Sequence, residues 1–282
     1  MQNLEIARRL HEVADLLEAQ GANPFRVGAY RRVAEKVHHL HKPLAEIYRE
    51  RGDQGLHDVT GAGERLTVAL RTMVTTGRLP MLDRLRGEAD PEAVLESVPG
   101  IGPALAERLH QEFDIDSLED LEAAAHDGRL SDLAGIGKKK LEGIIDTLAT
   151  RLGRIRQDSA AHHGDHPSVA ELLDVDREYR EKIALGALPK IAPRRFNPSG
   201  EAWLPVLHTH RGDRHYTALF SNTARAHEFH ATHDWVVLYY DGRMDEHQST
   251  VITAHRGHLT GKRIVRGREA ECEAYYAHPS EQ

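Results

Sequence analysis

Three short glycine turns punctuate the first half of the chain: Gly61-Ala62-Gly63, Gly100-Ile101-Gly102 and Gly135-Ile136-Gly137. Each turn follows a hydrophobic residue and precedes a stretch with the apolar spacing of a helix. Glycine lets the main chain turn sharply, and the first amides of a helix lack intrahelical partners and can bind an anion. The pattern therefore predicts helix-hairpin-helix motifs that bind the phosphate backbone of a nucleic acid.

The charge balance limits how strongly such a protein binds nucleic acid. The net charge is −7, and residues 1–157 carry 22 Lys and Arg against 26 Asp and Glu. Long-range attraction is therefore weak, although loop amides and a few nearby cations still bind phosphates locally. We expect modest affinity, strong salt dependence and little sequence preference.

The composition also indicates a compartment. Cys272 is the single cysteine, so the chain forms no internal disulfide. No apolar run approaches the roughly 18 residues of a membrane span, and residues 1–5 lack the basic and apolar regions of a signal peptide. These features favour the cytoplasm.

The chain divides into a helical half and a mixed half. Residues 3–152 carry helical apolar spacing almost throughout, whereas residues 157–167 carry none and indicate a linker. A helix is expected from Glu171 to Leu185, followed by strands at 203–207, 215–220, 234–240, 250–253 and 263–266. The predicted fold is an all-α N-terminal half of helix-hairpin-helix repeats plus a smaller α+β C-terminal domain with an antiparallel sheet. The 282 residues suffice for two domains with separate cores.

Three segments carry a family resemblance: Asn3-Leu-Glu-Ile-Ala-Arg-Arg-Leu10, residues 16–34, and Ser97-Val-Pro-Gly-Ile-Gly-Pro103. With the glycine turns, they resemble the N-terminal region of X-family DNA polymerases, especially the bacterial members, over residues 3–150. In that family the region comprises a small lyase or 5′-phosphate-binding domain and a helix-hairpin-helix domain that grips the DNA backbone. The resemblance implies binding to gapped, nicked or otherwise broken DNA, in repair or genome maintenance.

The resemblance and the composition together predict four segments. Residues 1–87 form an X-family-polymerase-like helical domain with the first hairpin, and residues 88–156 form a tandem helix-hairpin-helix domain. Residues 157–167 are the linker, and residues 168–282 form an α+β domain whose function the sequence does not indicate.

Two departures limit what the resemblance implies. The family's lyase lysine, six residues after the second glycine of the first turn, corresponds to Ala69, which has no amine to form an imine. Lys36 and Lys42 remain alternative amine nucleophiles. Arg65 cannot serve as one, because its guanidinium stays protonated. A polymerase palm needs a Gly-Ser helix start for the triphosphate and carboxylates that hold two metal ions, and residues after 150 contain no such combination. Asp174-Val-Asp176 is better explained as the acidic N-terminus of a helix. Polymerase activity is not expected.

The candidate site residues fall into two groups in the helical half. The 5′-phosphate site, implied by the resemblance, consists of Arg26, Tyr30 and Arg31, with a solvated basic face as the alternative. The three lysines after the third turn oppose the helix dipole, which favours a bound anion there. The predicted DNA-binding residues are Gly61, Gly63, Arg65, Gly100, Ile101, Gly102, Gly135, Gly137, Lys138, Lys139 and Lys140. For Ile101 the favoured alternative is a core residue that anchors its loop.

In the second half, one segment with the pattern strand, helix cap, helix is a candidate phosphate or nucleotide site, and an ordinary helix cap is the alternative. Its residues are Ser221, Asn222, Thr223, Arg225 and His227. Although 13 of the 20 histidines lie beyond residue 157, no cysteine pair completes a zinc set, and we predict no metal site. No cofactor is predicted either, with a monovalent cation at a helix-hairpin-helix loop as an open alternative.

Three functional hypotheses remain. The first is a DNA-binding protein without sequence preference that recognises gaps, nicks or ends and is not itself an enzyme. The second is a DNA-processing enzyme, such as a nuclease, a phosphate-processing enzyme or a residual lyase, whose catalytic module is the C-terminal domain. The third is an adaptor whose C-terminal domain binds a protein partner. No membrane partner is expected.

Overall fold

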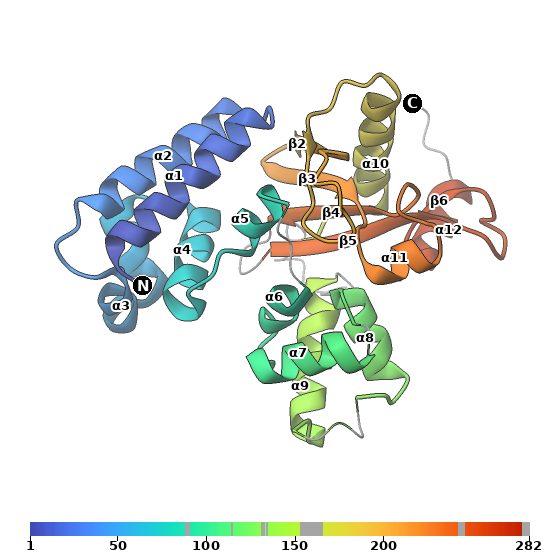
Figure 1. Ribbon diagram of the computed structural model, residues 1–282, viewed down its shortest axis with the longest axis horizontal. Coiled ribbons are helices and arrows are strands. Elements are labelled where there is room, and N and C mark those ends of the chain that lie inside the picture. The colour runs from blue at the N-terminus through green and yellow to red at the C-terminus, as the bar shows by residue number, and fades with distance from the viewer. Residues whose placement is uncertain are drawn as a thin grey trace.

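The computed structural model describes residues 1–87, 91–113, 115–130, 133, 135–152, 166–241 and 246–277. Figure 1 shows three bodies, blue to cyan, green, and yellow to red. We call them the first helical unit (residues 1–87), the second helical unit (residues 91–152) and the sheet unit (residues 166–277). Each contains its own cluster of buried apolar side chains.

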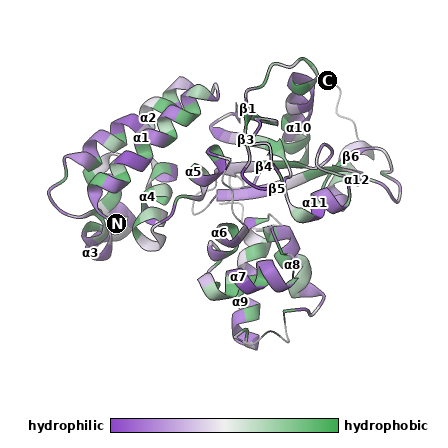
Figure 2. Cartoon of the chain, in the orientation of Figure 1, coloured by the Kyte–Doolittle hydropathy of each residue, from purple (hydrophilic) through white to green (hydrophobic). Residues whose placement is uncertain are grey.

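The first helical unit is built around an antiparallel pair of helices. Residues such as Ile6, Leu10 and Leu17 recur at helical spacing and are fully buried, and the helices show alternating green and purple stripes in Figure 2. Asn23 caps the second helix by accepting a hydrogen bond from Phe25 N at 2.9 Å. The helices are α1 (Asn3–Ala19), α2 (Pro24–His38), α3 (Leu44–Thr60), α4 (Glu64–Thr76) and α5 (Pro80–Leu85).

The second helical unit contains two helix hairpins side by side. They consist of α6 (Pro91–Glu96) with α7 (Pro103–Phe113), and α8 (Leu118–His126) with α9 (Lys138–Arg151). Ser117 caps α8 by accepting from Asp120 N at 3.1 Å. The two hairpins enclose one shared apolar core, so they form a single body.

The sheet unit is a six-stranded antiparallel meander in the order β1-β2-β3-β4-β5-β6. Helix α10 packs on one face, where the Tyr179 hydroxyl donates to the Pro205 carbonyl and accepts from Phe220 N, both at 2.9 Å. The strands are β1 (Lys190–Ile191), β2 (Leu204–Arg211), β3 (Arg214–Phe220), β4 (Val236–Asp241), β5 (Glu246–Thr253) and β6 (Arg263–Val265), and the helices are α10 (Val169–Ala184), α11 (Ala224–Glu228) and α12 (Glu269–Ala277).

The predicted fold class is confirmed: a helical half is followed by an antiparallel sheet with helices. The sequence pattern did not predict β1 or α12, and β2 and β5 are longer than expected because polar residues continue both strands. Most of the expected linker, residues 157–165, lies outside the described residues. Among those described, no helix is both long and apolar enough to cross a membrane.

Candidate nucleic-acid interface

The first glycine of each turn is required by the fold itself. Gly61, Gly100 and Gly135 have φ values of 62°, 92° and 96°, a region in which side chains are strained. Each turn leads directly into a helix, α4, α7 or α9, so all three predicted hairpin turns are present. The first-turn amides of these helices have no intrahelical acceptors.

The second glycine of each turn has no such internal requirement. Gly63 and Gly137 have φ values of −63° and −81°, and a Cβ added to Gly63, Gly102 or Gly137 would meet no atom of the described residues within 4 Å. All three are exposed. A residue with a side chain would therefore fit at these positions in the free protein.

The second and third turns share one geometry. Ile101 N donates to the Val98 carbonyl and Ile136 N donates to the Leu133 carbonyl, both at 3.0 Å. Both isoleucine side chains are buried in the core of the second helical unit. Ile101, predicted as a DNA-binding residue, therefore anchors its turn through its side chain and presents only main-chain atoms.

Lys140 joins these two turns. Its Nζ donates to the Gly135 carbonyl at 3.0 Å, and its Cε lies 3.5 Å from the position that a Cβ would take on Gly100. The Lys140 ammonium therefore donates a hydrogen bond to a carbonyl of the third turn. The sequence analysis left open that a monovalent cation binds at such a turn. Lys138 and Lys139 are exposed at the start of α9.

The first turn differs from the other two. Ala62 is buried, its amide donates to Thr60 Oγ1 at 3.2 Å, and its carbonyl lies 2.6 Å from His57 Nδ1. Lys36 Nζ lies 2.7 Å from the position that a Cβ would take on Gly61. Lys36 could not be assigned to this turn from the sequence, because only the packing of α2 on α3 brings it there.

The predicted 5′-phosphate residues do not converge on one point. Arg26 and Tyr30 share a face of α2, and both contact Met81 Sδ at 3.5 Å. Burial raises the pKa of Tyr30 to about 12, while nearby Arg26 opposes the shift. Arg31 instead faces α1, with its Nη2 2.7 Å from Glu18 and 3.1 Å from Asp15.

A cleft of 390 Å³ opens where the three bodies meet. Ala69 lines it, at the position of the family's lyase lysine, and Tyr30 lies at its wall. Arg65 also lines it and donates to the Asp213 carbonyl in the turn between β2 and β3. Further guanidinium groups come from Arg71, Arg78 and Arg151, of which Arg71 pairs with Asp53 and Arg78 with Glu96, both at 2.8 Å. The carboxylates of Glu96, Asp241 and Glu246 also line the cleft.

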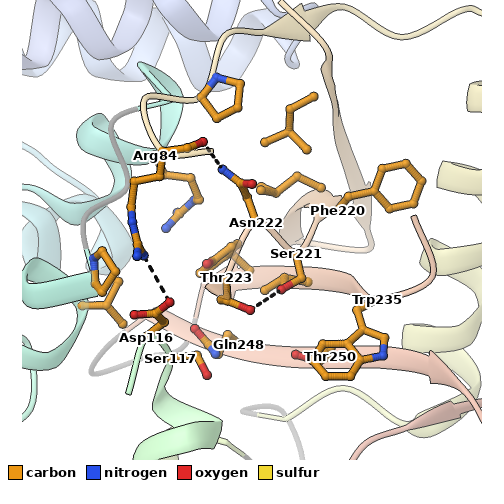
Figure 3. A pocket seen from close by; sticks show the side chains of 18 of the residues that line it. Arg84, Asp116, Ser117, Phe220, Ser221, Asn222, Thr223, Trp235, Gln248 and Thr250 are labelled. Carbon is orange, nitrogen blue, oxygen red and sulfur yellow. Dashed lines mark hydrogen bonds and ion pairs between the residues drawn. The ribbon is translucent and has the colours of Figure 1, made fainter. Parts of the chain in front are cut away.

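The candidate site in the second half is filled by a carboxylate of the second helical unit. The Asp116 side chain, labelled in Figure 3, is buried. It accepts from Ala224 N at 2.8 Å and lies 3.2 Å from Arg195 Nη1. Thr223 caps α11, accepting from Ala226 N at 3.2 Å. The helix-cap alternative accounts for this arrangement.

The other predicted site residues of this segment also form hydrogen bonds or ion pairs within the protein. Ser221 Oγ lies 3.2 Å from Thr223 Oγ1, Asn222 Nδ2 donates to the Arg195 carbonyl, and His227 Nε2 lies 2.6 Å from Asn222 Oδ1. Burial, with Arg195 nearby, lowers the pKa of His227. Arg225 Nη1 lies 3.3 Å from Asp120 Oδ1. Several of these residues line a small pocket of 90 Å³ between the sheet and second helical units.

The acidic pair Asp174 and Asp176 belongs to ion pairs on α10. Asp176 is buried and accepts two hydrogen bonds from Arg263, while Asp174 pairs with Arg211 at 2.6 Å. Among the described residues, no group of three His, Cys, Asp or Glu side chains could hold a metal ion.

Comparison with known proteins finds matches in the helical half. Residues 1–79 match the model of the helix-hairpin-helix domain, and residues 92–150 match that of the SAM-like helix-hairpin-helix tandem. Over 150 residues the chain is 28% identical to the DNA polymerase/3'-5' exonuclease PolX of Bacillus subtilis (strain 168). The N-terminal half is an X-family-like helix-hairpin-helix region. The match to the relative extends over 52% of this chain and 25% of that protein, so this chain matches about a quarter of that relative's length.

Proposed function

We propose that this protein binds DNA through the backbone amides of its glycine turns, without reading base sequence, in a repair-related context. The observation that carries the proposal is the second glycine of each turn: Gly63, Gly102 and Gly137 are exposed and open, with no internal reason to lack a side chain. Phosphate oxygens approach helix N-termini closely, and a Cβ at these positions would stand in their path. The X-family-like region supports the same ligand.

The preferred DNA is a gapped or nicked duplex with a 5′-phosphate. The cleft between the bodies supports this finer proposal, because Arg65 and Arg71 reach it from the first helical unit and Arg151 from the second. A terminal 5′-phosphate is small enough to enter this cleft of 390 Å³. Guanidinium groups suit a terminal phosphate because they form two parallel hydrogen bonds with it.

The backbone proposal is tested with the double variant Gly102→Ala/Gly137→Ala. We expect its affinity for a labelled gapped duplex to fall about tenfold in fluorescence anisotropy, a change of about 1.4 kcal/mol, because two methyl groups displace the phosphates. Its Tm should not be lowered. Gly143→Ala is the matched control: Gly143 is exposed on α9, also has open space at its Cβ, and lies outside the turns. Unchanged affinity in the double variant refutes binding through the turns.

The finer proposal needs a second comparison in the same assay. Wild-type protein is titrated with intact duplex, with a gapped duplex bearing a 5′-phosphate and with the same duplex bearing a 5′-hydroxyl. We expect the phosphorylated gap to bind most tightly. Equal affinity for all three refutes end recognition and leaves backbone binding standing.

A further inference from the structure

The sheet unit contacts both helical units through buried charged groups. On the side of the first helical unit, Arg84 is 6% exposed and donates from both terminal nitrogens to the Glu246 carboxylate at the start of β5. Its guanidinium carbon lies 3.8 Å above the ring of Tyr239 on β4. The ion pair and the stacking together fix the angle at which α5 meets the sheet.

On the side of the second helical unit, the helical unit contributes negatively charged side chains instead of a positively charged one. Asp116, Glu119 and Asp120, around the start of α8, are each 4–5% exposed. Asp116 pairs with Arg195, Asp120 pairs with Arg225, and Glu119 Oε1 accepts from Thr250 Oγ1 at 2.6 Å. One helical unit therefore brings a cation to the sheet and the other brings anions.

The connection between the helical units is also held by the sheet unit. The Gly87 carbonyl accepts from Arg194 N at 2.7 Å, and a Cβ on Gly87 would lie 2.6 Å from the Ala192 carbonyl oxygen. Gly87 has a φ of 75°, so its conformation and its close contact both require glycine. The chain leaving the first helical unit is thus fastened to the segment after β1.

These contacts select one arrangement of the bodies. The three apolar clusters contain no common residue, and buried polar groups are among the contacts that join the bodies. A buried charge is tolerated only when its partner is in place, whereas the same group in a separated unit returns to water. A rotated or shifted arrangement would leave Arg84 buried without Glu246, and this penalty makes the observed orientation specific.

We propose that the sheet unit is a rigid bridge that holds the two helical units at one separation and orientation, so that their glycine turns bind one DNA molecule together. This gives the C-terminal half a function that needs no catalytic site. Two weak phosphate-binding sites held rigidly bind far more tightly than either alone, because the second site engages without further loss of freedom. The affinity part of this inference rests on the proposed function; the geometric part does not.

The test measures distance and affinity separately. Dyes are placed on the full chain at two exposed positions, Arg49→Cys on α3 and Glu142→Cys on α9; the natural Cys272 is fully buried. Without DNA, single-molecule energy transfer should give one narrow distance distribution, which Gly87→Ala broadens. In anisotropy, Gly87→Ala should weaken duplex binding at least tenfold.

Gly77→Ala is the matched control, because Gly77 also has a positive φ, 73°, but has open space at its Cβ and lies at the end of α4. Glu246→Ala serves as a second bridge variant that removes the partner of Arg84 without backbone strain. If both bridge variants keep the narrow wild-type distribution, or if the wild-type distribution is already broad, the bridge is refuted. If wild-type protein shows the narrow distance but binds no DNA, the DNA-binding function fails and the geometric bridge stands.

Discussion

At the scale of single residues, His208 forms a hydrogen-bonded link between two bodies. Its Nε2 lies 2.9 Å from Gln20 Oε1, just after α1, and its Nδ1 lies 3.1 Å from Thr217 Oγ1 on β3. Burial lowers the pKa of His208 to about 3, and Arg26 and Arg84 add to the shift. The ring is therefore neutral at physiological pH, with one nitrogen donating and the other accepting.

This residue predicts an acid-sensitive stability. Between pH 3 and the ordinary histidine pKa near 6.5, the unfolded chain binds a proton at His208 that the folded chain does not. The contribution of neutral His208 to the free energy of unfolding is present in full above pH 6.5 and is lost as the pH falls toward 3. Thermal unfolding at pH 7.5 and pH 5.0 should show a smaller fall in Tm for His208→Gln than for wild type. Parallel falls in the two proteins would contradict the assignment.

Individual residues also show what the sequence could and could not predict. Asn23, Ser117 and Thr223 have the short polar side chains of helix caps, and the structure places all three at helix starts. The role of Asp116 was not predictable, because Arg195 and Ala224, its partners, lie far along the chain and only the docked arrangement brings them together. The local sequence pattern identifies a helix cap. It does not identify a side chain from far along the chain that packs next to that cap.

At the scale of elements, the start of α9 is the most positively charged of the three turns. Lys138 and Lys139 are exposed there, in contrast to Lys42, whose ammonium pairs with Glu50 at 2.5 Å. In the proposed function the two lysines neutralise phosphates and release counterions.

The double variant Lys138→Met/Lys139→Met tests this element. The slope of log affinity against log salt should become shallower by about two, because each phosphate that a lysine neutralises contributes about 0.9 to the slope. Anisotropy titrations at four salt concentrations measure the slope. The control is Lys42→Met, away from the turns; an equal change in both variants would show that the lysines at α9 act through net charge alone.

Elements were predictable to the extent that they are amphipathic. The apolar stripes of α1 and α2 lie within the stretch expected to be helical, and the apolar runs of β3 and β4 lie where strands were expected. The two-residue strand β1 is too short to show alternation, and α12 buries only Cys272 among its described side chains. Neither carries a periodic signal.

At the scale of the whole molecule, an acidic protein is expected to bind an acidic polymer only where local groups outweigh the net charge of −7. The turns present main-chain amides, which contact phosphates and carry no information about bases. We therefore expect duplexes of the same length but unrelated sequence, one rich in A·T and one rich in G·C, to bind within about twofold of each other in competition. A preference above about tenfold would indicate base contacts instead.

The arrangement of the bodies was the least predictable level. Arg84 and Glu246 are 162 residues apart, and Glu119 and Thr250 are 131 residues apart. Charged residues on helices usually face water, so nothing in the local sequence around Arg84 or Glu119 indicates burial. The glycine turns, by contrast, are local features, which is why the sequence located all three.

The polar character of the surfaces that meet the sheet unit has a consequence during synthesis. Domains fold in order as the chain leaves the ribosome, so both helical units complete their cores before the last strands exist. Had their docking surfaces been apolar, the nascent helical half would expose them to aggregation throughout that interval. The charged groups of Arg84 and Glu119 instead remain hydrated until their partners on β5, Glu246 and Thr250, are synthesised.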